Sequence, residues 1–172
     1  GTLFPLMEHS KSDQKKRLHK KVFKFTNAKN RPLISHSGKL PPFGDILQIL
    51  DRYHLLPAIF FLKSRADCDQ AIKLCNSSLL SKNPKKKAAL YQKINELVSG
   101  NPHLAKHKQR SFLEQTATAS HHSGHLPAWK VVVETLMAEG LLDAMFATST
   151  VAAGVNFPAR SVVVLNSDRF NG

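Results

Sequence analysis

Hydroxyl, amide and glycine residues gather between two apolar stretches near the end of the 172-residue sequence. The stretches are LLDAMFA (141–147) and SVVVL (161–165), and the turn between them carries Thr148, Ser149, Thr150, Gly154, Asn156 and Pro158. Hydroxyls and backbone amides can hold phosphate oxygens. Ligands of parallel α/β sheets collect where strands end, so we expect a binding site at residues 148–158. An ordinary strand–turn–strand connection is the alternative interpretation.

A second polar turn follows the apolar run PAIFFL (57–62). Ser64 and Arg65 lie between this expected strand and a stretch with helical periodicity. Backbone N–H groups at a helix N-terminus favour an anion, so both residues are candidates for phosphate binding. Ser64 alternatively caps the helix, and it can do both.

A third turn, HHSGH (121–125), precedes a helix that we expect to start near Pro127. His121 and His125 are four residues apart, a spacing that suggests zinc, but Gly124 and Pro127 would break the helix that such a pair needs, and no nearby Cys or acid completes a tetrahedron. We therefore predict no metal site. We expect instead that Ser123 and the Gly124 backbone face a phosphate.

Charge is the most informative part of the composition. Twenty-five Lys and Arg residues face twelve Asp and Glu residues, and the net charge is +13. The basic residues cluster at 11–24, 82–87 and 106–110. Each cluster alone is an ordinary solvated face, but together they indicate a polyanionic partner, nucleic acid first and an anionic membrane surface second.

Other classes are disfavoured by composition. Apolar residues make up 42% of the chain, too many for a disordered protein, and no apolar run approaches the roughly 18 residues of a membrane span. We expect an intracellular, cytoplasmic protein. Cys68 and Cys75 are expected on one helix face, too far apart for a disulfide and serving as core residues.

The periodicities predict an α/β protein with a parallel sheet. Residues 1–42 should be irregular, with a short strand at 22–26. The remaining expected elements are a helix at 43–53, a strand at 57–62, a helix through 65–79, an insertion at about 82–118 of one helix ending near Gly100 and a second helix at 103–120, a helix to Gly140 with Val131, Val132, Leu136 and Met137 on its apolar side, and strands at 141–147 and 161–165.

Three segments together resemble consecutive blocks of superfamily-two helicases, most closely the superkiller-like DExH branch. PAIFFLKSRADCDQAI (57–72) resembles motif IV, HHSGHLPAWKVVVE (121–134) resembles the segment before motif V, and FATSTVAAGVNFPARSVVV (146–164) resembles motif V. The third is the most specific. The resemblance covers roughly residues 43–167 and implies the second of two RecA-like lobes, with residues 1–42 as an interlobe linker and first strand.

The resemblance also implies roles for individual residues. Two residues would lie in the interlobe cleft near ATP, namely Gly154 and Asn156. Six would meet the sugar-phosphate backbone of a single RNA or DNA strand, namely Ser64, Arg65, His122, Ser123, Gly124 and Thr148. Groups that hold phosphate without reading bases suit a translocating motor.

The sequence lacks the motifs GxxxxGK[ST], DExH and QxxGRxGR. In the family, the first two belong to the first lobe and the third to motif VI, and they supply the ATP grip, the Mg²⁺ site and the arginine finger. We therefore expect a fragment, cut before motif VI, that holds no catalytic residue and is inactive alone. Two alternatives are a non-catalytic binding or scaffold protein on a degenerate helicase lobe, and a basic α/β enzyme acting on phosphorylated small molecules.

Overall fold

The computed structural model describes residues 40–148 and 157–165, together with the backbone of two short strands nearer the N-terminus. The chain divides into two compact units, residues 1–41 and 42–172. In the first unit, β1 (Met7–Glu8) pairs antiparallel with β2 (Arg17–Leu18). The strand expected at 22–26 lies outside the described residues.

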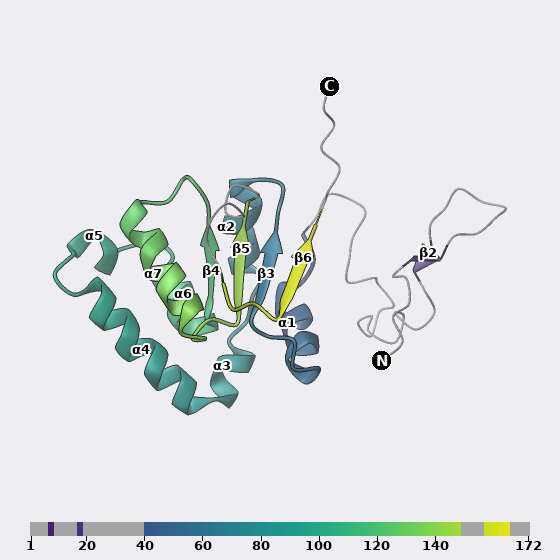
Figure 1. The fold of residues 1–172 in the computed structure, drawn as a ribbon, viewed down its shortest axis with the longest axis horizontal. Coiled ribbons are helices and arrows are strands. Elements are labelled where there is room, and N and C mark those ends of the chain that lie inside the picture. The colour runs from purple at the N-terminus through teal and green to yellow at the C-terminus, as the bar shows by residue number, and fades with distance from the viewer. Residues whose placement is uncertain (1–6, 9–16, 19–39, 149–156, 166–172) are drawn as a thin grey trace, which may run out of the picture. The chain divides into compact units, whose positions relative to one another are not determined.

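The second unit holds a parallel sheet with helices on both faces (Figure 1). Its strands run in the order β4-β5-β3-β6, and every pairing is parallel. The predicted α/β class with a parallel sheet flanked by helices is confirmed. In chain order its elements are α1 (Phe43–Arg52), β3 (Ala58–Phe61), α2 (Arg65–Lys73), α3 (Ser78–Lys82), α4 (Pro84–Val98), α5 (Pro102–Ala105), α6 (Arg110–Thr116), β4 (Thr118–His121), α7 (Pro127–Ala138), β5 (Ala144–Ala147) and β6 (Ser161–Val164).

The strand register aligns the carboxyl ends of three strands. Phe61, the last residue of β3, pairs with Ala147, and Ala147 pairs with His121 at the end of β4. The segments that follow these strands, which include the polar turns, therefore leave the sheet at one edge. We call this the carboxyl edge, and it comprises residues 62–65, 122–125 and 148.

Alternating side chains divide the core between the two faces of the sheet. On one face, Phe60 and Phe146 stack with ring centroids 5.1 Å apart, and Phe43 of α1 meets both rings edge-on. On the other face, Met145 and Ala147 belong to a larger apolar cluster that includes residues of α4, α6 and α7. Strands β3 and β5 therefore each contribute to two separate packing layers.

Two boundaries differ from the sequence-based expectation. Residues 118–121 form the buried strand β4, although we expected them to end a helix; Thr118, Ala119 and Ser120 lack the apolar run that identifies a buried strand. Helix α2 ends at Lys73, so Cys75 lies beyond the helix that carries Cys68. A separate short helix, α3, follows.

The apolar side of α7 also differs in one residue. Val132, Leu136 and Met137 are buried as expected, but Val131 is exposed, and Trp129 and Val133 are buried instead.

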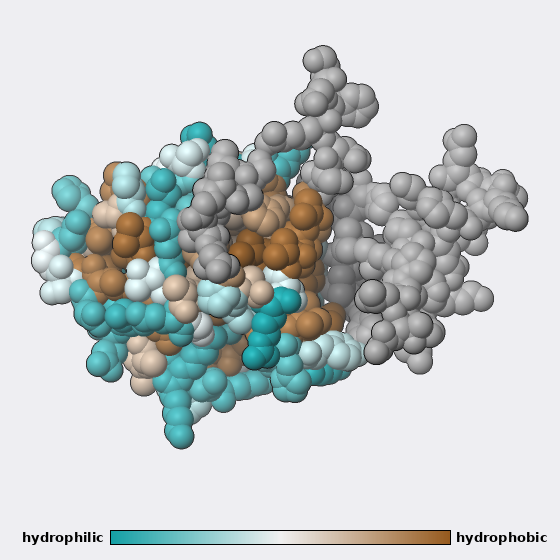
Figure 2. Space-filling view, in the orientation of Figure 1, coloured by the Kyte–Doolittle hydropathy of each residue, from teal (hydrophilic) through white to brown (hydrophobic). Residues whose placement is uncertain are grey.

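An exposed apolar area lies over β6, where Val162 and Val164 are each 60% exposed (Figure 2). Within the described part of the chain, no helix is long and apolar enough to span a bilayer.

Replacing Phe60 with alanine should lower the free energy of unfolding by about 3–5 kcal/mol, because the ring is fully buried between two other rings and its loss leaves a cavity. Urea unfolding followed by circular dichroism measures this. Val131→Ala, on the exposed face of α7, is the control and should change the value by less than about 0.5 kcal/mol. Equal effects of the two substitutions would contradict the described core.

Candidate functional site

The structure brings the described candidate residues to the carboxyl edge. Ser64 and Arg65 follow β3, the turn at 122–124 follows β4, and Thr148 directly follows β5. Gly154 and Asn156 lie outside the described residues.

Gly124 lies between two of the other candidates. A Cβ atom built at this glycine would be 3.0 Å from His122 Nδ1 and 3.4 Å from Arg65 Cδ. The first distance is tighter than ordinary van der Waals packing and the second is at its lower limit, so a side chain at position 124 would crowd the His122 ring and meet the Arg65 side chain. The turn after β4 and the start of α2 therefore touch through the space that glycine leaves.

Ser64 caps helix α2. Its Oγ accepts a hydrogen bond from the Asp67 backbone N–H at 3.1 Å and donates one to Asp67 Oδ2 at 2.8 Å. The capping interpretation of Ser64 is therefore confirmed, and its hydroxyl hydrogen is used within the protein. Its neighbour Arg65 is exposed and forms no ion pair with any carboxylate in the described part of the chain.

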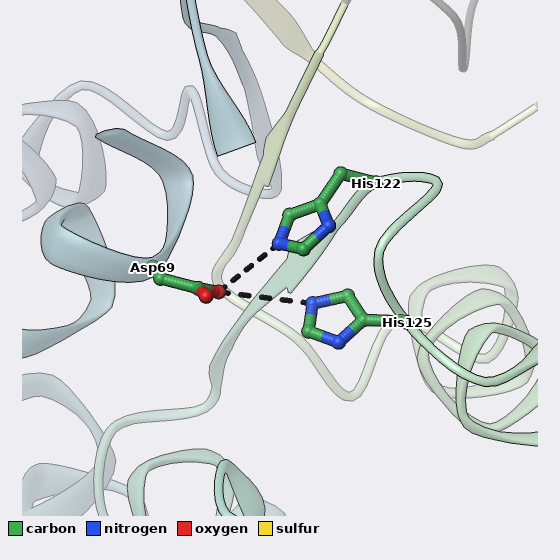
Figure 3. Close-up of side chains that lie close together, drawn as sticks. All are labelled: Asp69, His122 and His125. Atoms are coloured by element: carbon green, nitrogen blue, oxygen red, sulfur yellow. Dashed lines mark hydrogen bonds and ion pairs between the residues drawn. The ribbon is translucent and has the colours of Figure 1, made fainter. Parts of the chain in front are cut away.

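Asp69 joins two histidines beneath the turn (Figure 3). Asp69 comes from α2, and its Oδ1 lies 3.1 Å from His122 Nε2 and 3.8 Å from His125 Nε2. Both histidines are buried, with His122 only 3% exposed. We expected no acid near these histidines, and that expectation is wrong, because the fold brings in an acid from a helix more than fifty residues earlier.

Three ligand atoms of this cluster lie within 4.8 Å of one another, close enough to surround a metal ion. The hydrogen bonds of His122 argue against one. The Gly124 N–H donates to His122 Nδ1 at 3.1 Å, so Nδ1 carries a lone pair and the proton of the neutral ring is on Nε2, facing Asp69. A cation at Nε2 would move that proton to Nδ1, where it would oppose the Gly124 N–H. The donor set therefore fits a hydrogen-bonded network better than a cation.

His121 takes no part in that cluster. Its Nε2 lies 2.6 Å from Glu134 Oε1 on α7, and its other ring nitrogen, Nδ1, is buried without a hydrogen-bond partner among the described residues. His121 and His125, the pair whose spacing suggested zinc, therefore interact with different acids.

The electrostatics of the cluster favour an ionised Asp69 beside a neutral His125. Burial opposes ionisation of Asp69, but hydrogen bonds from His122, Ser120 and Lys108 outweigh it and lower its pKa to about 2. Burial lowers the pKa of His125 to about 4 and also that of His107, which stacks on Trp129 with ring centroids 3.8 Å apart. Near neutral pH, His107 and His125 are therefore uncharged.

A cavity of about 400 Å³ lies at the opposite edge of the sheet, where β3 and β5 begin. Asp143 and Lys86 are among its lining residues and form an ion pair of 2.6 Å. Burial raises the pKa of Asp143. The cavity contains none of the candidate residues, and its mixed charges do not single out one class of ligand.

Acidification from pH 7 toward pH 4 should lower the free energy of unfolding. His107 and His125 titrate near pH 4 in the folded chain and near 6.5 when unfolded, so between these values the unfolded chain binds more protons and stability falls with pH. Asp69 stays ionised in this window, and its contribution is lost only below its unfolded value of 3.8. Urea unfolding at a series of pH values measures the loss.

His125→Gln should flatten this pH dependence, and His103→Gln, at an exposed position, should leave it unchanged. Stability that is constant or that rises between pH 6.5 and 4.5 would contradict the buried neutral histidines.

Comparison with known proteins gives relatives of one kind. No protein-family model matches the chain. It is 37% identical over 134 residues to the probable helicase HelY of Mycobacterium leprae, covering 74% of this chain and 14% of HelY. It is 35% identical to the chloroplastic DExH-box ATP-dependent RNA helicase DExH15 of Arabidopsis thaliana (74% of this chain, 11% of the relative) and 36% identical to human superkiller complex protein 2 (68% and 10%).

The chain thus spans only about a tenth to a seventh of the length of these relatives. By homology and fold, the chain belongs to the superkiller-like DExH branch of the superfamily-two helicases, as a segment of that family's longer sequence.

Proposed function

We propose that the chain forms part of the second RecA-like lobe of an ATP-dependent nucleic-acid helicase, and that its carboxyl edge holds the sugar-phosphate backbone of one strand. The observation that carries this proposal is the closeness of the Arg65 side chain to the Gly124 turn, where an added Cβ atom would lie 3.4 Å from Arg65 Cδ, at the edge where three parallel strands end. Strand ends of α/β sheets are where ligands bind, and an exposed guanidinium beside a narrow turn suits a phosphate.

Within this proposal, the candidate residues divide into contacting and supporting groups. Arg65 and Ser123 are exposed and can reach a phosphate, and Thr148 follows β5 at the same edge of the sheet. His122 is buried with both ring nitrogens hydrogen-bonded, so we assign it the role of shaping the turn. Ser64 orients the first turn of α2 through its cap, so we assign it a supporting role as well.

Charge supports a polyanionic partner at the same edge. Lys63 and Arg65 are exposed on either side of Ser64, and the exposed Lys108 forms an ion pair of 3.3 Å with Asp69 beneath the turn. With a net charge of +13, the chain attracts a phosphate backbone from all directions, and the exposed cations at this edge add local attraction. Because one of the relatives is named an RNA helicase, we propose single-stranded RNA as the strand.

ATP and Mg²⁺ belong to the parent protein in this proposal. ATP would lie between this lobe and a first lobe, with Gly154 and Asn156 on this side of the cleft. The described residues offer no phosphate-binding loop of the GxxxxGK[ST] type and no acid cluster suited to Mg²⁺, so the described part does not fit the nucleotide by itself. The role of this chain is to bind the strand and to complete the cleft.

Arg65→Ala should weaken binding of a single-stranded RNA oligonucleotide about 5- to 20-fold at low salt, because one charge-assisted phosphate contact is lost. It should also reduce the slope of log affinity against log salt by about 0.7, the share of one single-strand phosphate. Fluorescence anisotropy at several salt concentrations measures both quantities.

Arg52→Ala is the matched control, because Arg52 is also exposed but lies at the end of α1, just before β3 begins at the opposite edge. It should change affinity far less. Equal effects of the two substitutions would indicate diffuse attraction to the whole basic surface. Binding of wild-type chain without any salt dependence would instead favour an enzyme acting on small phosphorylated molecules.

The chain alone, mixed with ATP, Mg²⁺ and RNA, should release no phosphate above a blank, because the ATP grip and the arginine finger are absent from its sequence. A coupled phosphate-release assay tests this, with the longer parent protein as the positive control. Turnover by the pure chain would contradict the proposal. An inactive parent would favour the degenerate, non-catalytic binding or scaffold protein.

A further inference from the structure

Gln109 links the helical insertion to the buried network under the turn. It lies between α5 and α6, and it is only 3% exposed. Its side-chain Nε2 donates to Asp69 Oδ1 at 2.6 Å and to Ser120 Oγ at 2.7 Å, and its Oε1 accepts from the Ser120 backbone N–H at 3.4 Å. One buried amide therefore joins the insertion to helix α2 and to strand β4.

The chemistry of this amide fixes the direction of its hydrogen bond to Asp69. The Gln109 –NH₂ group can only donate, and the ionised Asp69 carboxylate can only accept. Between them, Ser120 Oγ lies 2.8 Å from both Asp69 Oδ1 and His125 Nε2, and it can donate to either. Asp69 Oδ1 is thus surrounded by hydrogen-bond donors, and the His122 Nε2–H is one of them.

The segment that carries Gln109 is itself held in place. Arg110, the next residue, donates to Glu114 at 2.7 Å, to the Ala105 carbonyl at 3.2 Å and to Asn95 Oδ1 at 2.8 Å, so it ties α4, α5 and α6 together. The Gln109 backbone N–H also bonds His107 Nδ1, and the His107 ring stacks on Trp129. Gln109 is therefore presented to the network from a well-anchored position.

We propose that Gln109 is a positioning residue for the His122–Gly124 turn, and that the helical insertion acts through it to keep the carboxyl edge in the conformation that binds nucleic acid. The inference rests on the proposed function, because it assumes that this turn faces a polynucleotide. Gln109 holds Asp69, Asp69 orients His122, and His122 accepts the Gly124 N–H that closes the turn. The insertion is then part of the binding apparatus, although Gln109 itself touches no phosphate.

The experiment compares Gln109→Leu with Gln115→Leu, the same change at an exposed position of α6. Two readouts are taken from the whole chain: affinity for a single-stranded RNA oligonucleotide as a function of salt, and the imidazole ¹⁵N spectrum, which reports which nitrogen of His122 carries the proton. We expect Gln109→Leu to weaken binding about tenfold, the loss typical of removing a buried hydrogen-bond partner, with an unchanged salt slope and a changed His122 spectrum. Gln115→Leu should match wild type.

Gln109→Glu supplies a second variant if the leucine variant fails to fold. It keeps the volume and one acceptor oxygen but replaces the donating –NH₂ with a carboxylate facing Asp69, so we expect an equal or larger loss of affinity and the same spectral change. A variant that folds and keeps both wild-type affinity and the wild-type His122 spectrum would overturn the inference. So would a change in only one of the two readouts, or a loss of affinity accompanied by a lower salt slope, which would make Gln109 a direct contact.

Failure of the proposed function can be distinguished from failure of the inference about Gln109. If wild-type chain does not bind the oligonucleotide, or if Arg65→Ala behaves as Arg52→Ala, the assignment of the edge fails whatever Gln109 does. If Arg65→Ala weakens binding as expected and Gln109→Leu does not, only the inference about Gln109 fails.

Discussion

The register of parallel strand pairing is the constraint on which the rest of this structure depends. Because β3, β4 and β5 start and end level with one another, the residues after Phe61, His121 and Ala147 emerge together. These segments are separated by 60 and 26 residues of sequence, and no local interaction would bring them into contact. Shifting one strand by a single residue would turn its buried side chains to the opposite face, so burial on both faces of the sheet enforces the alignment.

On this scaffold, a single carboxylate organises the turn after β4. Asp69 is ionised, partly buried and surrounded by donors from α2's neighbours, namely Gln109, Ser120 and His122. The same three-residue set of Asp69, His122 and His125 is superficially suited to a metal ion. The difference is decided by one backbone amide, because the Gly124 N–H fixes the lone pair on His122 Nδ1 and so directs the other ring nitrogen to donate. Proximity of ligand atoms alone does not make a cation site.

The sequence predicts much of the architecture because long apolar runs and helical periodicity are local signals. The strands at 58–61, 144–147 and 161–164 and the helices α1, α4 and α7 follow from them. Strand β4 does not, because it is built of small and polar residues whose burial comes from neighbouring strands and helices. The role of Ser64 as a cap is visible in its position before a helix.

The buried network is less accessible to sequence reasoning. Asp69 sits on a helix among other polar residues, and Gln109 lies in a stretch that we read as one continuous helix. Neither has a motif around it that signals its partners. Their meeting depends on the insertion folding back over α2 and β4, and that packing is a property of the whole unit. The sequence shows only a glutamine between two basic residues, Lys108 and Arg110, and its burial becomes visible only in the structure.

Strand β6 is an edge strand of the sheet within the described part of the chain, and an edge strand is a place where another extended segment can pair. The exposed side chains of Val162 and Val164 add apolar surface next to this edge. The strong positive charge opposes such self-association by mutual repulsion, and dissolved ions weaken that repulsion. Added electrolyte should therefore have two effects: it weakens binding of a polyanion, and it allows copies of the protein to approach one another. The high salt concentrations that release a bound nucleic-acid strand are then also those at which the free protein is most prone to aggregate.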